Sequence, residues 1–307
     1  MPLSRRDFLK SGLILTGGVL LPRWAHAADA PQFDRLPDVV HVTGGGPDAL
    51  LRRAIDELGG LSHYVKPGMS VLINPTVGFP NPPEMATTTD PQLITAMIDL
   101  CKEAGARSIT VADYPVRDPD LCFERSGIGD LARLNGVDVI PLNARSPYTT
   151  TSIPGAVEVA EVDLATLVHA SDVLISMPIA KSHASSGVSF ALKNNMGLIQ
   201  ARGPFHARYD LHQAIVDLGK LIKPTLIVTD AQRALVTRGP GGPGRVETPG
   251  AVIAGLNAAC VDAYTVGIAS WYNQSLRPDQ VKHIRLAGEQ GLGEIDCSRQ
   301  DIRRVTV

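Results

Sequence analysis

The sequence has few cysteines, and none of them are paired at a metal-binding spacing. Cys101, Cys122, Cys260 and Cys297 lie far apart, and no C-x-x-C occurs. A cysteine-ligated iron–sulphur cluster or zinc ribbon is therefore not predicted. Cys101 and Cys260 fall on apolar helical patterns and are expected to be buried free thiols. The spacing leaves open whether Cys122 and Cys297 pair in an oxidising compartment.

Long basic runs and long apolar runs are also missing. The 307 residues hold 29 Lys or Arg and 31 Asp or Glu, a formal net charge of −2. Because no basic patch stands out, nucleic acid is not an expected partner. Beyond the N-terminal segment, no apolar stretch reaches the roughly 20 residues that a helix needs to cross a bilayer. No stable membrane span is therefore expected in the mature chain.

The N-terminal segment has the three parts of an export signal. The pair Arg5-Arg6 comes first, a short apolar stretch with glycines follows over 13–21, and Ala25-His26-Ala27 forms a small-x-small cleavage site. This order is typical of secretory signals, and the arginine pair indicates the twin-arginine route. We expect residues 1–27 to engage the twin-arginine translocon and direct the protein to the periplasm. Cleavage after Ala27 and retention as an anchor are both open.

The remaining residues, 28–307, alternate short apolar strands with amphipathic helices. A Thr- and Pro-rich stretch over 147–154 is expected to be a crossing connection, and residues 179–208, rich in Gly, Ser, Asn, Lys and His, are expected to be the least regular part. The alternation predicts a single α/β domain with a largely parallel, Rossmann-like sheet and helices on both faces. The predicted helices cover 47–58, 91–103, 124–134, 210–221, 258–270 and 278–287, and the predicted strands cover 70–73, 108–112, 137–140, 172–177, 225–229 and 251–254.

Polar or ionisable residues follow the predicted strands where each one ends. Asn74, Asp113 and Asp230 come directly after a strand, and Lys181 and His183 come shortly after another. Open α/β sheets bind ligands beyond the carboxyl ends of their strands, so these residues are expected to share a site. The alternative is the ordinary polarity of loops, which accounts for part of the set.

The densest group of such residues falls within 181–206. A lysine offers positive charge for a carboxylate or phosphate, and acts as a base or nucleophile where burial lowers its pKa. A histidine transfers protons near neutral pH or binds a metal, and asparagines orient polar groups of a ligand. Taken singly, solvated lysines and structural histidines remain the alternative. The group comprises two lysines, two histidines and two asparagines: Lys181, His183, Lys193, Asn194, Asn195 and His206.

Several of these segments together resemble the family called domain of unknown function 362. The resemblance rests on Asn74-Pro75, Thr88–Pro91, Lys181-Ser182-His183, Lys193–Gly197 and Thr229-Asp230-Ala231, within residues 38–293. It implies an α/β fold and the positions of a site, and no particular reaction. Many relatives carry an appended ferredoxin-type domain with four-cysteine motifs. This chain has no such motif, so the resemblance does not extend to an iron–sulphur cluster.

Two functions fit these residues. The first is an enzyme acting on a small anionic substrate, in which the two lysines hold charge, His183 or His206 transfers protons, and Asp113 or Asp230 orients a histidine or a metal. A fold-level analogy to nickel-pincer racemases is compatible with proton or hydride chemistry. The second is a non-catalytic protein that binds or delivers a metal, a cofactor or an anion through the same residues. The cofactor and the metal are unknown from the sequence.

Overall fold

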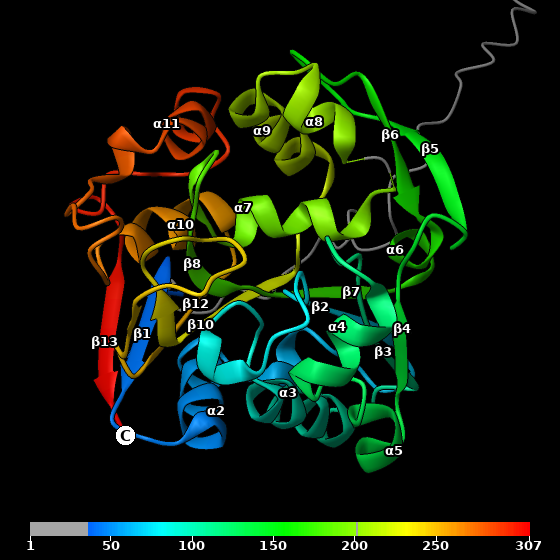
Figure 1. The fold of residues 1–307 in the computed structure, drawn as a ribbon. Helices are drawn as coiled ribbons and strands as arrows, with labels where there is room; N and C mark the ends of the chain where they lie inside the picture. The colour runs from blue at the N-terminus through cyan, green and yellow to red at the C-terminus, as the bar shows by residue number, and fades with distance from the viewer. Residues whose placement is uncertain (1–35, 201) are drawn as a thin grey trace, which may run out of the picture.

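The computed structural model describes residues 36–200 and 202–307, so the predicted signal over residues 1–27 lies outside the described residues. One large sheet runs through the described part of the chain (Figure 1). Its principal strands, in spatial order, are β13 (Ile302–Thr306), β1 (Val39–Thr43), β12 (Ala251–Gly255), β10 (Leu226–Leu235), β7 (Val173–Met177), β2 (Ser70–Pro75), β3 (Ser108–Asp113) and β4 (Asp138–Pro141).

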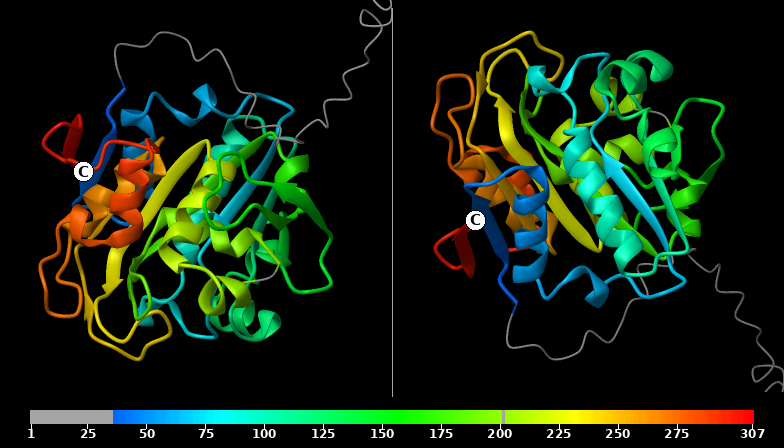
Figure 2. Two further views of the ribbon diagram at one scale, coloured as in Figure 1. Left: turned by 90° about the horizontal axis from the view of Figure 1, so that it is seen from above. Right: turned by 90° about the horizontal axis from the view of Figure 1, so that it is seen from below.

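Most neighbouring strands in this sheet are parallel. The run from β10 through β7, β2 and β3 to β4 is parallel throughout, whereas β12 is antiparallel to both β1 and β10. Helices cover both faces (Figure 2), which confirms the predicted fold class. One face carries α2 (Pro47–Glu57) and α3 (Pro91–Glu103), and the other carries α6 (Thr166–Ala170), α9 (Leu211–Leu221), α10 (Ala258–Val266) and α11 (Lys282–Glu289).

Strand β2 shows why both faces need helices. Its side chains alternate across the sheet, so Val71 and Ile73 pack into the cluster beneath α2 and α3, and Leu72 packs into the cluster beneath α9. All three are at most 1% exposed. Burying an aliphatic side chain of this size contributes roughly 1.5–3 kcal/mol. A strand that is apolar on both sides is stable only between two layers of helices.

Helix α3 begins and ends where its sequence predicts. The Asp90 carboxylate accepts a hydrogen bond from the Gln92 N–H at 2.8 Å, and Pro91 occupies the first turn. Beyond the last turn, Gly105 has a φ of +81°, a left-handed conformation that favours glycine. Local capping is therefore sufficient to set both ends of this helix.

Other predicted boundaries were wrong for local reasons. The helix predicted over 124–134 is two helices, α4 (Pro119–Ser126) and α5 (Leu131–Asn135), because Gly127 ends the first with a φ of +76°. The stretch 147–154, predicted as a crossing connection, contains a strand, since β5 (Tyr148–Ser152) pairs with β6 (Glu161–Ala165) in a separate antiparallel sheet. Its threonines suit a half-exposed strand.

The stretch 179–208 contains more regular structure than predicted. Strand β8 (Ile179–His183) follows β7 after Pro178 and pairs with β9 (Gly187–Ser189) in a short hairpin. Strand β10 continues past Asp230 and pairs with β8, with Leu235 opposite Lys181. The segment then forms three short helices, α7 (Ala191–Asn194), η4 (Asn195–Leu198) and α8 (Gly203–Ala207). Its polar side chains therefore stand on ordered backbone.

All four cysteines are free thiols, so Cys122 and Cys297 do not pair in this structure. Cys101 and Cys260 are buried, as predicted from their helical patterns. Among the described helices, none combines the length and the apolar character needed to cross a membrane.

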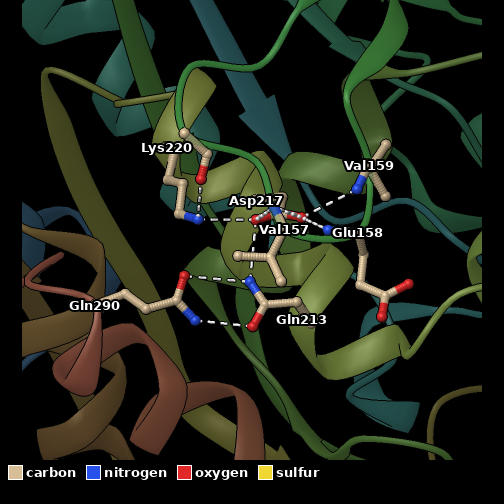
Figure 3. Close-up of polar contacts among 8 residues, drawn as sticks. Val157, Glu158, Val159, Gln213, Asp217, Lys220 and Gln290 are labelled. Carbon is tan, nitrogen blue, oxygen red and sulfur yellow. Dashed lines mark hydrogen bonds and ion pairs between the residues drawn. The ribbon is translucent and has the colours of Figure 1, made fainter.

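A buried carboxylate fixes α9 to the loop that follows β5 (Figure 3). Asp217, which is fully buried, accepts hydrogen bonds from the backbone N–H groups of Val157, Glu158 and Val159 at 2.7–3.1 Å. The same carboxylate pairs with Nζ of Lys220 at 2.9 Å. Gln213, one turn earlier, also donates to it at 3.0 Å and exchanges hydrogen bonds with Gln290 beyond α11. These contacts hold the helices above the sheet in place.

Candidate functional site

A cavity of about 440 Å³ lies beyond the carboxyl ends of the central parallel strands. The chain order runs outward from β2 to β4 on one side and from β7 to β10 on the other, so the strand order reverses between β2 and β7. Such a reversal is the usual ligand position in open α/β sheets. The polar and ionisable residues that line the cavity include Thr76, Asp113, Lys181, His183, Lys193, Asn194, Arg202 and His206.

Six of the nine residues predicted for the site line this cavity, and three do not. The strand ends, the β8–β9 hairpin, α7 and α8 each contribute to the lining, which is why residues far apart in the sequence meet. The six are Asp113, Lys181, His183, Lys193, Asn194 and His206, whereas Asn74, Asn195 and Asp230 lie outside the lining.

Asn74 supports the cavity without lining it. Its Nδ2 donates to the Ala112 carbonyl at 2.9 Å, and its Oδ1 and backbone carbonyl both accept from Nδ2 of Asn194 at 2.9 Å. Oδ1 of Asn194 accepts in turn from the Thr76 hydroxyl at 2.7 Å. The predicted ligand-binding amides of Asn74 and Asn194 are thus used to fix α7 against the end of β2.

Asn195 and Asp230 are also used within the fold. Nδ2 of Asn195 donates to the Ile222 carbonyl at 3.1 Å, after α9. Oδ2 of Asp230 accepts from the Asp90 N–H at 2.9 Å, and Oδ1 accepts from the Gln232 N–H at 3.1 Å. Asp230 therefore joins the start of α3 to β10. The expected ligand role of these two residues does not match their position, because each side chain is turned to backbone outside the cavity.

Lys181 is a buried cation held in one place. It is 3% exposed, its Nζ donates to the Thr87 carbonyl at 2.8 Å, and it lies 5.6 Å from the centre of the Phe79 ring. Burial lowers the pKa of Lys181 to about 8, and the nearby Asp113 carboxylate opposes that shift. Such a lysine presents positive charge to a ligand at neutral pH.

Lys193 stands on α7, whose N-terminus is held by a buried acid. The Asp262 carboxylate of α10 accepts from the N–H groups of Ala191 and Leu192 at 2.8 and 2.9 Å. Burial raises the pKa of Asp262 to about 7. Burial, together with Lys181 and Arg202, lowers the pKa of Lys193 to about 7. From the sequence alone, Asp262 resembles an acid that only stabilises the start of its own helix. Its role in holding α7 is not visible there, because the Leu192 N–H that it accepts from is 70 residues away in the sequence.

The two histidines of the cavity face each other. The rings of His183 and His206 are stacked, with centroids 6.2 Å apart and planes 13° apart. Nδ1 of His183 accepts from the Ser185 N–H at 3.1 Å, which assigns the proton of the neutral ring to Nε2. Burial, followed by Lys193 and Lys181, lowers the pKa of His183 to about 2. His183 is therefore a neutral hydrogen-bond donor rather than a base.

Asp113 is the one carboxylate among the described residues that line the cavity. Its Oδ2 accepts from the Val77 N–H at 2.7 Å, and its Oδ1 lies 3.4 Å from Nδ2 of Asn74. Burial raises the pKa of Asp113 to about 6. Gly197 packs directly against it, since a Cβ there would lie 1.8 Å from Oδ1. Any side chain at Gly197 would displace the acid.

Arg202 was not anticipated from the sequence. Its guanidinium lies 4.5 Å from the centre of the Tyr114 ring and donates to the Pro115 carbonyl. Burial lowers its pKa, and Asp113 opposes the shift. A single arginine in an irregular segment carries no motif, and only its position four residues before His206 places it with the other candidates.

The lining carries a surplus of positive charge. Three basic side chains, Lys181, Lys193 and Arg202, face one carboxylate, and the lysines are 3% and 8% exposed. Across residues 36–200 and 202–307, no group of three or more His, Cys, Asp and Glu side chains is placed to hold a metal ion. The donors that do converge, ammonium, guanidinium and imidazole N–H groups, match the oxygens of an anion.

Two known proteins are similar to this chain. The chain is 28% identical over 255 residues to the thylakoid-associated protein sll1697 of Synechocystis, covering 80% of this chain and 74% of that protein. Among solved structures, it is similar to the lactate racemase apoprotein of Thermoanaerobacterium thermosaccharolyticum, with a TM-score of 0.48 and 14% identity. That similarity covers 78% of this chain and 60% of the racemase, so the chain spans less than two thirds of the racemase.

The model of one protein family matches more than half of the chain. The match covers residues 71–267, a narrower range than the resemblance had indicated, and it includes both lysines, both histidines and Arg202. The chain belongs to the family described as domain of unknown function 362.

Proposed function

We propose that the cavity binds a small organic anion with up to two negative charges. The observation that carries the proposal is the surplus of basic side chains, the buried Lys181 and Lys193 and the half-buried Arg202, over the single carboxylate of Asp113. Buried charges of one sign are costly unless a partner neutralises them, and an anionic ligand is such a partner. The volume of about 440 Å³ lies in the usual range for small-molecule sites.

The same cavity supports acid–base chemistry on that anion. Asp113, with a pKa of about 6, and Lys193, with a pKa of about 7, both change protonation state near neutral pH. His183 contributes a neutral N–H, and the ring of His206 lies beside it in the lining. Paired groups with opposite shifts are a feature of catalytic sites. We therefore favour an enzyme over a passive binding protein.

The alternative is a carrier that binds and delivers the same anion without changing it. Both functions require the basic lining, and they differ in the fate of the ligand. Nuclear magnetic resonance spectra of the ligand after prolonged incubation with the protein separate them, because an enzyme changes the ligand or exchanges its protons with solvent and a carrier returns it unaltered.

Calorimetric titration with glutarate, a simple organic dianion, tests the binding proposal. We expect Lys181→Met and Arg202→Met each to weaken glutarate binding by at least about tenfold, the cost of losing one charge-assisted contact in the cavity. Lys223→Met is the matched control, because Lys223 is exposed and lies outside the cavity. Equal affinity in all four proteins would contradict the proposal.

We also propose that the protein works in the periplasm after export through the twin-arginine translocon. The support is the order of the N-terminal segment: Arg5-Arg6, the short apolar stretch over 13–21, and Ala25-His26-Ala27. This route carries folded proteins, so the cavity would be complete before export.

A further inference from the structure

We infer that Lys193 forms an imine with the carbonyl group of a small anionic ligand of the 2-oxo acid class. The inference rests on the proposed function, since the basic lining supplies the charge that seats the carboxylate of such a ligand. It goes further because it assigns a covalent step to one of two lysines in the same cavity.

Lys193 lacks a strong acceptor although it is buried. Its side chain lines the cavity and is 8% exposed. Within the described part of the chain, the hydrogen bond of its Nζ goes to Sδ of Met196 at 3.3 Å, and a thioether is a weak acceptor. No carboxylate of the described residues lies within ion-pair distance of this Nζ. An unpaired ammonium is costly in such a place, so the site favours the neutral amine that attacks carbonyl carbon.

Neighbouring charges act in the same direction. Burial and, after it, the two cations Lys181 and Arg202 together lower the pKa of Lys193 to about 7. A lysine that is desolvated beside other cations is a recognised form of activated nucleophile. At neutral pH, a substantial fraction of Lys193 is therefore uncharged.

Lys181 provides the contrast within the same cavity. Its Nζ is bonded to the Thr87 carbonyl at 2.8 Å and lies against the Phe79 ring, and the Asp113 carboxylate favours its charged form. These contacts hold Lys181 as an ammonium, suited to a ligand carboxylate. The two lysines are thus divided into one that binds charge and one that is free to react.

The remaining cavity groups suit a carbonyl compound. Because Nδ1 of His183 is occupied by the Ser185 N–H, the neutral ring presents Nε2–H as a donor, which can polarise a ligand carbonyl. Asp113 has a pKa of about 6 and can pass a proton to the departing oxygen. A donor, a proton source and a neutral amine therefore line one cavity.

The step balances without any redox partner. The lone pair of Nζ forms a bond to the carbonyl carbon, the electron pair of the C=O bond moves to oxygen, and a proton passes from nitrogen to that oxygen. The resulting hydroxyl takes a second proton and leaves as water, and the nitrogen lone pair forms the C=N bond. One carbonyl, one amine and one proton yield one iminium and one water. The iminium carries the positive charge that the added proton brings, so the total charge is unchanged by the step.

Reductive trapping tests the inference on the wild-type protein. The protein is incubated with glyoxylate, pyruvate or 2-oxoglutarate and cyanoborohydride, and the reduced adduct is located by mass spectrometry of peptides. We expect one adduct per chain at Lys193, none at Lys181, and loss of the adduct in the presence of excess glutarate. In Lys193→Arg, which retains the charge but cannot form an imine, we expect trapping to fall at least about tenfold, while glutarate binding, although weaker, remains measurable.

Binding of the same probes without reductant separates the two proposals. If calorimetry shows that 2-oxoglutarate binds but no probe labels Lys193, the imine is wrong and the anion site stands. If neither 2-oxoglutarate nor glutarate binds, both proposals are wrong. Labelling spread over surface lysines, unaffected by glutarate, would also overturn the imine. Melting curves of Lys193→Arg establish that it is folded before its trapping is compared with that of the wild type.

Discussion

At the scale of single residues, the cavity brings together several ionisable side chains whose charged forms are disfavoured by burial. Lys181, Lys193 and Arg202 all have pKa values lowered first by burial, and Asp113 has a pKa raised by burial. Each shift records a charged form that the fold disfavours in the absence of a ligand. Sites that bind charge commonly cost stability in this way.

The cost at Lys193 gives a prediction with a definite sign. The pKa of Lys193 is about 7 in the folded chain against an ordinary 10.5, so between these values the unfolded chain holds a proton that the folded chain lacks. Stability from this group therefore rises with pH over that window and is lowest below about pH 7. Lys193→Met removes the penalty, and we expect it to raise the melting temperature by several degrees at about pH 7.

The melting temperatures of wild type and Lys193→Met, followed from about pH 7 to about pH 10, check this prediction. The difference between the two melting temperatures should narrow as pH rises, because the loss of the Lys193 proton on folding costs less free energy at higher pH. A gap that stays constant, or a variant less stable than wild type at neutral pH, would mean that Lys193 has a partner and a structural role.

Sequence alone identified most of the ionisable residues of the cavity but could not assign their separate roles. Residue type and position after a strand grouped Lys181, His183, Lys193 and His206. The same rule selected Asn195 and Asp230, which bond to backbone elsewhere, because spacing does not show which way a side chain turns. Arg202 was missed since it belongs to no motif.

At the scale of secondary structure elements, local signals were sufficient where capping decides the boundary. Helix α3 has both its Asp90 cap and its terminal Gly105 in the sequence. Strands that depend on distant partners were not predictable in the same way. Strand β8 forms because β10 continues past Asp230 to pair with it, and that pairing joins residues more than 50 positions apart.

The junction around α9 gives a prediction about stability. Asp217→Asn replaces an oxygen that accepts from backbone N–H groups with a donor, and it removes the charge that pairs with Lys220. We expect a loss of roughly 3 kcal/mol in the free energy of unfolding, or about 5–10 °C in melting temperature. Circular dichroism melting curves measure both.

Asp163→Asn is the control for this junction. Asp163 accepts a hydrogen bond from the Thr150 hydroxyl at an exposed position, so its loss should change stability by less than about 0.5 kcal/mol. If the two variants have the same melting temperature, the contacts around Asp217 drawn in Figure 3 do not stabilise the fold as we argue.

At the scale of the whole molecule, the sheet determines where the site lies in the fold, and the predicted signal would determine the compartment in which the protein works. The reversal of strand order between β2 and β7 creates the position beyond the strand ends where the cavity lies. The alternation of strands and helices was enough to predict this class of sheet. It could not reveal that β12 runs antiparallel, because strand direction depends on pairing with β1 and β10.

Export is tested by changing the arginine pair alone. We expect the double variant Arg5→Lys, Arg6→Lys to remain in the cytoplasmic fraction, while the wild type reaches the periplasmic fraction, since the twin-arginine route depends on the paired guanidinium groups. Immunoblots of fractionated cells measure this. Equal export of both proteins would show that another route is used.

The most direct test of the anion site is the number of protons taken up when glutarate binds at about pH 8, the pKa of Lys181. An anion beside Lys181 and Lys193 raises their pKa values, so both lysines should take up protons as the ligand enters. Calorimetric titrations in two buffers of different ionisation enthalpy give that number. We predict an uptake on the order of one proton in the wild type and a smaller uptake in Lys193→Met. Binding with no proton uptake, or no binding at all, would contradict a cavity whose buried lysines are neutralised by an anion.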